Sequence, residues 1–277
     1  MPGCENRLFV AYKPSFISSN AFLSEIKKRY KVKKAGFSGT LDPFARGVLI
    51  VAFSQYTKLF RFLKKSPKVY RATLWLGAES ETLDLEGIVK IKEVPKFRES
   101  VIKEVLKSFE GEIEYYPPKF SAKKIGGKRA YEMARADRDF KLKKVKSEIY
   151  DIKLVCYSHP FLTFEISVSE GGYARSIGDL IARKLGVCGA LSYLERIREG
   201  EFFYEGEKEL DPSCYLNAKE NFYLNDIENI EKGKVLRAED FKFREDGDYF
   251  IKHNGLLTVI KIKDKRVIYE VNGIKLC

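Results

Sequence analysis

The chain has 277 residues, of which 44% are hydrophobic, and its formal net charge at neutral pH is +12. This length suits one large domain with or without a small appendage, and the apolar content argues against disorder over most of the chain. The longest apolar run, residues 48–53, is far too short to cross a bilayer, and no signal-peptide segment precedes the first expected strand. We therefore expect a cytoplasmic protein without membrane segments.

In the first half of the chain, strand and helix patterns mix without a regular order. The patterns predict a strand, a helix, a loop, a buried strand, a short helix and another strand, over residues 8–13, 18–30, 35–47, 48–53, 56–63 and 69–76. Ser18 or Ser19 suits the N-cap of the first helix. In the last strand Tyr70, Ala72 and Leu74 share one face, as expected for a sheet with one buried side.

The second half predicts a clear amphipathic helix, a short helix, two strands, two further helices and three closing strands, over residues 101–109, 130–135, 149–156, 161–169, 173–185, 191–197, 249–252, 256–262 and 267–271. Gly186 suits the C-terminal end of the helix at 173–185. Because βαβ alternation is absent, we expect an α+β fold with a mostly antiparallel sheet. The main domain is expected over residues 1–215, and a small β-rich region over 225–277.

The use of histidine and cysteine restricts the chemistry that the chain can perform. Two histidines occur, and the five cysteines are widely spaced with no CxxC pair. This argues against histidine-dependent triads and against metal sites. No phosphate-binding loop is visible either, so we expect no metal and no other cofactor. Nucleophilic or acid–base chemistry then falls to carboxylates, lysine or tyrosine.

Positive charge is concentrated in two segments. Residues 119–146 contain eleven Lys or Arg against three acidic residues, and a second basic cluster lies at 27–34. Such local excess favours a polyphosphate partner, because each neutralised phosphate releases counterions. A solvated charged surface is the alternative interpretation of the same pattern.

One loop is the best candidate for a reactive site. Residues 36–49 place Asp42 among three glycines, a threonine and a proline, directly before a buried strand. A loop of this kind can hold a carboxylate rigidly at a sheet edge and bring its backbone close to a ligand. Taken alone, an Asp-Pro pair in a glycine-rich loop is more often a simple turn.

Five blocks of sequence, in the same order, resemble the motifs of the TruB-type tRNA pseudouridine(55) synthase family. They lie at residues 12–14, 39–43, 68–72, 117–124 and 169–176. The resemblance implies the pseudouridine synthase fold, in which helices flank a mixed, mostly antiparallel central sheet. It also implies an isomerase that converts uridine 55 in the TΨC arm of tRNA to pseudouridine, and a C-terminal region that is a reduced PUA-like domain.

The resemblance assigns catalytic roles to three residues. Asp42 would be the nucleophile, since an ionised carboxylate can form the covalent intermediate needed to break a C–N glycosidic bond and remake it as C–C. Arg175 would hold Asp42 in a bidentate ion pair. Tyr70 would stack on the target base, which must leave the RNA stack to be reached.

Other residues would bind the substrate. Tyr173 and Leu194 match positions around the flipped uracil, Gly39 and Thr40 belong to the motif loop, and Lys13 would support that loop or approach a phosphate. The tRNA-binding block contributes Lys123, Lys124, Lys128 and Arg129. Two departures from the family occur. Phe37 replaces the usual histidine, so it can only stack or fill space, and Gly172-Tyr173-Ala174-Arg175 replaces Thr-Tyr-Ile-Arg.

Two other functions remain open. The first is a related synthase acting on other RNA, such as the guide-dependent ribosomal RNA type, against which the short C-terminal region argues. The second is an RNA-binding tRNA-folding chaperone with secondary catalysis. The presence of Asp42, Tyr70 and Arg175 together argues against complete loss of catalysis. We expect a monomer with no obligate protein partner.

Overall fold

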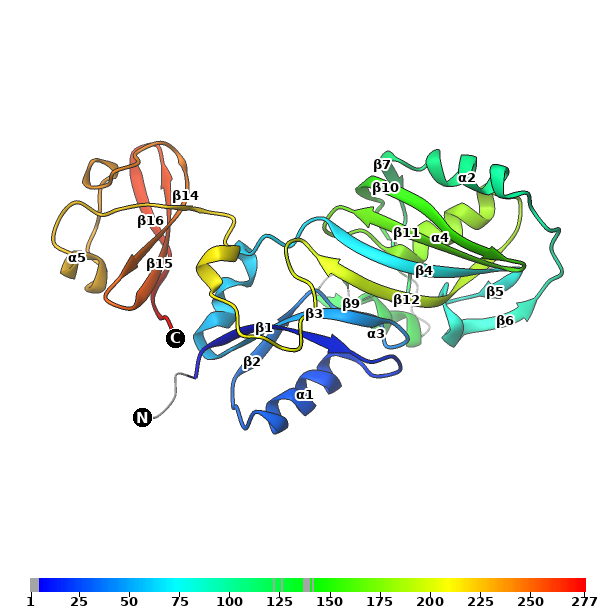
Figure 1. Cartoon of the computed structure of the whole chain (residues 1–277), viewed down its shortest axis with the longest axis horizontal. Coiled ribbons are helices and arrows are strands. Elements are labelled where there is room, and N and C mark those ends of the chain that lie inside the picture. The colour runs from blue at the N-terminus through cyan, green and yellow to red at the C-terminus, as the bar shows by residue number, and fades with distance from the viewer. Residues whose placement is uncertain (1–4, 122, 126, 137–139, 141) are drawn as a thin grey trace.

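The computed structural model describes residues 5–121, 123–125, 127–136, 140 and 142–277. A large domain built on one sheet lies beside a small C-terminal unit, and the molecule is elongated along the line that joins them (Figure 1). In the part of the chain described, no helix is long and apolar enough to span a membrane.

The large domain contains an eight-stranded sheet in the order β1-β3-β12-β4-β11-β10-β7, with β2 also paired to β3. Its strands are β1 Arg7–Lys13, β2 Ala35–Ser38, β3 Arg46–Phe53, β4 Lys68–Leu76, β7 Gly111–Tyr115, β10 Val145–Ser158, β11 Phe161–Val168 and β12 Gly189–Glu199. All of these pairings are antiparallel except β12 with β3. The expected mixed, mostly antiparallel sheet is confirmed.

Helices cover the sheet where its strands carry apolar side chains. Helix α1, Ser19–Arg29, buries Phe22 and Ile26 against β1 and β3. Helices α2, Glu99–Lys107, and α4, Ala174–Lys184, enclose the main core together with β4, β11 and β12. The alternating apolar side chains of β4 are buried in this core, as their period of two predicted.

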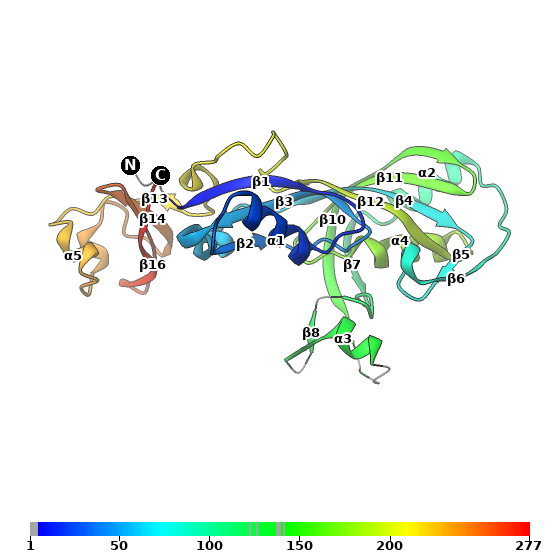
Figure 2. The same ribbon diagram turned by 90° about the horizontal axis from the view of Figure 1, so that it is seen from below.

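The remaining elements of the large domain are short. They include the hairpin β5 Ala78–Ser80 and β6 Ile88–Ile91, and the 3₁₀-helices at Ser54–Phe62, Leu85–Gly87 and Pro212–Tyr215. An insert between β7 and β10 carries β8 Lys124–Ile125, β9 Lys128–Arg129 and α3 Ala130–Arg135. Figure 2 shows this insert projecting away from the sheet.

The C-terminal unit is a four-stranded sheet in the order β13-β14-β15-β16. Its elements are β13 Lys219–Glu220, α5 Glu228–Glu231, a 3₁₀-helix at Ala238–Asp240, β14 Gly247–His253, β15 Leu256–Lys263 and β16 Arg266–Lys275. The expected start at residue 225 lies inside this unit, because β13 pairs with β14. Phe250 and Val259 share a core with Val48 and Ile50 of β3, so the unit packs against the large domain.

Two expectations about local structure are wrong. Residues 191–197 are not helical but belong to β12, which pairs with β4 on one side and β3 on the other. The expected loop at 35–47 begins with β2, because the backbone of Phe37 pairs with that of Val51. At 191–197, pairing with strands far away in the sequence overrides local propensity, and at 35–38 pairing with the next strand along the chain does so.

Candidate active site

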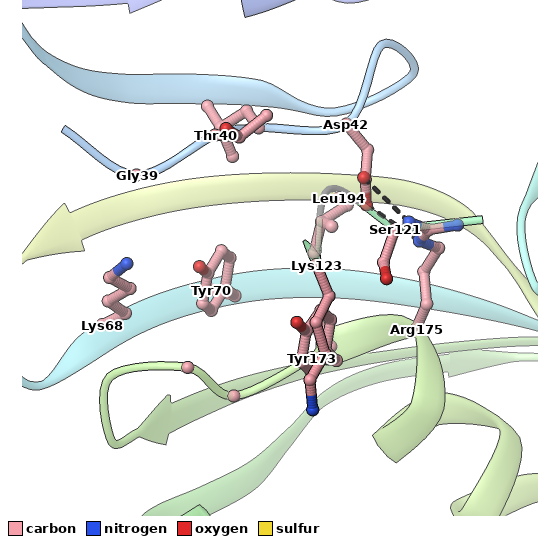
Figure 3. Close-up of a pocket in the computed structure, with 14 residues that line it drawn as sticks. Gly39, Thr40, Asp42, Lys68, Tyr70, Ser121, Lys123, Tyr173, Arg175 and Leu194 are labelled. Atoms are coloured by element: carbon pink, nitrogen blue, oxygen red, sulfur yellow. Dashed lines mark hydrogen bonds and ion pairs between the residues drawn. The ribbon is translucent and has the colours of Figure 1, made fainter. Parts of the chain in front are cut away.

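Asp42 lies in the loop between β2 and β3, beyond the point where the two strands pair (Figure 3). Gly39, at a φ of 68°, adopts a left-handed conformation that glycine tolerates best. The Ser19 hydroxyl both accepts from the Leu41 amide and donates to the Leu41 carbonyl, each at 3.0 Å. The residue before Asp42 is thereby tied to the start of α1.

Lys13, the last residue of β1, holds the same loop through buried hydrogen bonds. Its ammonium is fully buried and donates to the carbonyls of Pro14, Ile17 and Pro43, at 2.8, 2.7 and 3.2 Å. Lys13 is therefore placed to hold the loop and not to meet a phosphate. Burial lowers the pKa of Lys13 to about 8, and the nearby Asp42 carboxylate opposes that shift.

The lowered pKa of Lys13 predicts a pH dependence of stability. Between pH 8 and about 10.4 the unfolded chain binds more protons at this position than the folded one, so the free energy of unfolding rises with pH. Between pH 7.5 and pH 10, the free energy of unfolding of the wild type, measured with urea, should rise by about 1–3 kcal/mol relative to that of Lys13→Met. A constant difference between the two proteins would show that Lys13 keeps an ordinary pKa.

Arg175, at the start of α4, joins Asp42 to three other groups. Its Nη2 and Nε lie 2.8 Å from the two carboxylate oxygens of Asp42, which gives a bidentate pair between residues 133 positions apart. Nη2 also donates to the Phe120 carbonyl, and Nη1 to the carbonyl of Thr82 and the carboxylate of Asp84. The guanidinium is 5% exposed, so its position is fixed on all sides.

Asp84 is a site residue that sequence reasoning did not single out. It lies 3.2 Å from Arg175 and accepts from the Thr82 hydroxyl at 2.5 Å. Burial raises the pKa of Asp84 above its ordinary value, although Thr82 and Arg175 oppose the shift. The available signal was the segment Thr82-Leu83-Asp84, which follows the block at residues 68–72 and continues its resemblance to the TruB family. Arg175 therefore lies between an accessible carboxylate and a buried one.

A group of buried charges lies beneath Gly39. Arg196 and Glu199 of β12 are both fully buried, and Lys68 of β4 is nearly so. Glu199 lies 3.2 Å from Arg196 and 3.4 Å from Lys68, while Arg196 donates to the carbonyls of Gly39 and Val48. A Cβ at Gly39 would come within 3.0 Å of Glu199 and 3.2 Å of Arg196. These three residues, which the sequence did not reveal, form the base of the loop.

Two cavities meet at Asp42 and Arg175. The first, of about 310 Å³, is lined by Gly39, Thr40, Asp42, Lys68, Tyr70, Lys123, Tyr173, Arg175 and Leu194 among others, and Figure 3 shows these side chains around it. The second, of about 510 Å³, is lined by Ser18, Phe37, Asp84, Glu86 and Phe120 on its far side. The structure thus brings most of the expected residues together. Phe37, however, lines the second cavity, whereas Tyr70 lines the first.

Comparison with known proteins identifies the family. The family model described as "TruB family pseudouridylate synthase (N terminal domain)" matches residues 27–174, which is more than half of the chain. The chain belongs to the TruB family. It is 56% identical to the tRNA pseudouridine synthase B of Nitratiruptor sp., over 97% of this chain and 98% of that protein. It is 51% identical to the protein of the same name from Campylobacter jejuni, over 98% and 100%.

Solved structures of low sequence identity show the same fold. The chain matches one in a Cbf5-Nop10-Gar1 complex with a TM-score of 0.70 at 21% identity, over 97% of this chain and 84% of that one. A second match is to an H/ACA RNP bound to a substrate RNA, with a TM-score of 0.66 at 20% identity, over 98% and 85%. The pseudouridine synthase fold expected from the TruB resemblance is therefore confirmed.

Some residues of the TruB-like tRNA-binding block cannot be placed at the site. The backbones of Lys124, Lys128 and Arg129 lie in β8 and β9, but their side chains fall outside what the structure describes. Lys123 is described and lines the first cavity. Among the described residues, no group of three or more His, Cys, Asp or Glu could hold a metal ion.

Proposed function

We propose that this protein is a tRNA pseudouridine synthase, an isomerase that converts uridine 55 in the TΨC arm to pseudouridine. The observation that carries the proposal is the bidentate pair of Arg175 with Asp42 at the wall of a cavity large enough for one base. The TruB family and its relatives named tRNA pseudouridine synthase B point to the same reaction.

The residues around the cavity suit this chemistry. Asp42 is 32% exposed, while its partner Arg175 is buried. It acts as the nucleophile that stays covalently attached to the sugar or the base after the C–N bond breaks. The bond between uracil N1 and C1′ breaks, and C1′ forms a new bond to C5. C5 then loses its proton and N1 gains one, so no atom is gained or lost overall. Tyr70 stacks on the flipped base, and Leu194 and Tyr173 close the cavity around it. Burial raises the pKa of Tyr173, so its phenol stays neutral.

A direct experiment tests the reaction. The purified protein is incubated with unmodified tRNA transcripts in chelator-containing buffer, and pseudouridine is mapped at single-nucleotide resolution. We expect one modified position, uridine 55, without added metal or cofactor. Modification that needs a guide RNA, or that occurs only in ribosomal RNA, would favour the related synthase type. Binding and refolding of tRNA without any modification would favour a chaperone.

The basic insert at residues 119–146 is proposed as the main electrostatic contact with tRNA. Replacing Lys123, Lys124, Lys128 and Arg129 by Ala should weaken binding and flatten its salt dependence, by roughly 0.7–0.9 in log–log slope for each phosphate that is no longer neutralised. The matched control replaces Lys103 and Lys107 of α2, which pair with Glu99 and Glu110. An unchanged slope in the first variant would show that the insert does not meet phosphate.

Phe37 is proposed to contact RNA while also packing in the core. It is half-buried against the apolar residues between α1 and β3, and it lines the second cavity. Phe37→Ala should therefore lose about 1–3 kcal/mol of stability and also raise KM for tRNA. Phe37→Leu should recover the melting temperature but not KM, because only an aromatic ring stacks on a base. Wild-type kinetics and melting in the Ala variant would remove both roles.

We further propose that the enzyme acts in the cytoplasm as a monomer and that its C-terminal unit is a reduced PUA-like domain. Support for the last point is the four-stranded sheet and its shared core with the large domain. Deleting residues 219–277 would expose that core, so exposed charges on the unit should be replaced instead when its contribution to tRNA binding is measured.

A further inference from the structure

Phe16 has an unusual combination of backbone conformation and exposure. Its φ is 64°, a left-handed conformation that bulky residues rarely adopt. It is also 76% exposed, among the highest values for a large apolar residue in the described chain. The protein thus maintains a strained backbone at a position where the side chain is not buried in the core. Strain of this kind concentrates at functional sites.

The loop around Phe16 is held firmly against the loop that carries Asp42. The Phe16 amide donates to the Pro43 carbonyl at 2.7 Å, and the Lys13 ammonium binds the carbonyls of Pro14 and Ile17 on either side. Ser18 then caps α1 by accepting from the Ala21 amide at 3.1 Å. These bonds impose the conformation of Phe16, so the exposed position of its side chain is built into the site.

The position of Phe16 is next to the cavities. Its amide is hydrogen-bonded to the carbonyl of Pro43, the residue after the proposed nucleophile. Ser18, Ser19 and Pro43 line the second cavity. An RNA that delivers a uridine to Asp42 must therefore pass close to this loop. When the target base leaves the stack, its neighbours lose a stacking partner, and an aromatic side chain can replace it.

We propose that Phe16 is a substrate-binding residue that stacks on an unpaired nucleobase adjoining the target uridine. The proposal rests on the proposed function, because it takes the RNA to be the substrate delivered to Asp42. The occupant is a base and not a phosphate, since the side chain offers an aromatic face and no charge. Stacking of this kind is tolerant of base identity, so Phe16 adds affinity more than sequence specificity.

Three variants separate stacking from a structural role. Phe16→Gly removes the aromatic ring and relieves the strain of the left-handed backbone, whereas Phe16→Tyr keeps an aromatic ring. The control, Ser54→Gly, relieves a φ of 49° at the junction between β3 and the 3₁₀-helix that follows it, without changing any charge. We expect Phe16→Gly to raise KM for a TΨC stem-loop by roughly 5- to 150-fold without lowering the melting temperature. Phe16→Tyr and Ser54→Gly should keep the wild-type KM.

The base that Phe16 contacts can be found with abasic substrates. The loop nucleotides other than the target are replaced by abasic sites one at a time, and binding to wild type and Phe16→Gly is compared as a double-mutant cycle. We expect one position at which base removal weakens wild-type binding but not binding to the variant. An unchanged KM in Phe16→Gly, or a raised KM with no coupled position, would overturn the inference. Absence of pseudouridine formation by the wild type would instead overturn the proposed function.

Discussion

Asp42→Asn should lower the rate of pseudouridine formation by roughly 10⁴-fold or more, while tRNA affinity stays within a few-fold of wild type. An amide has nearly the same shape as the carboxylate but is not a nucleophile, so the covalent step is lost. The Asn oxygen can still accept one hydrogen bond from Arg175, which is itself held by Asp84 and two carbonyls. The geometry of the cavity should therefore survive.

Single-turnover kinetics with a saturating excess of enzyme measure this effect, and filter binding measures the affinity. The matched control is Glu170→Gln, because Glu170 is an exposed acid paired with Lys65 just before the glycines that line the cavity. That variant should turn over at nearly the wild-type rate. If the Asn variant did so as well, Asp42 would have no part in the mechanism.

Glu199→Gln should reduce the free energy of unfolding by about 3–5 kcal/mol, because it leaves two buried cations without their anion. Glu199 is fully buried between Arg196 and Lys68, which are 0% and 10% exposed. A neutral amide cannot balance their charge. Since Arg196 also donates to the Gly39 carbonyl, the loop that carries Asp42 should shift, and kcat should fall along with stability.

Urea unfolding of the two proteins measures the loss. The control is Glu201→Gln, two residues further on, where the pair with Lys64 is half-exposed and its loss should stay within about 1 kcal/mol. Equal stability of the Glu199 and Glu201 variants would show that the buried charges are not needed to hold the loop. Loss of stability with an unchanged kcat would restrict their role to folding.

Local sequence patterns determined many of the elements and the candidate residues of the site. The period-two pattern of β4, the amphipathic period of α2 and the glycine after α4 each predicted the correct element. These signals are local, because they depend on which side chains share a face within a few residues. The TruB motifs likewise identified Asp42 and Arg175, and the structure contains the ion pair expected between them.

The tertiary structure alone decided what depends on distant strands. The segment at 191–197 resembled a helix, and only its pairing with β4 and β3 made it a strand that carries Leu194 into the cavity and Arg196 beneath Gly39. Asp84 gained its role because Arg175, 91 residues away in the sequence, reaches it. Phe37 lines the second cavity and Tyr70 the first, and the pairing of β2 with β3 fixes the position of Phe37. Long-range pairing and burial set these positions, and no local pattern reports them.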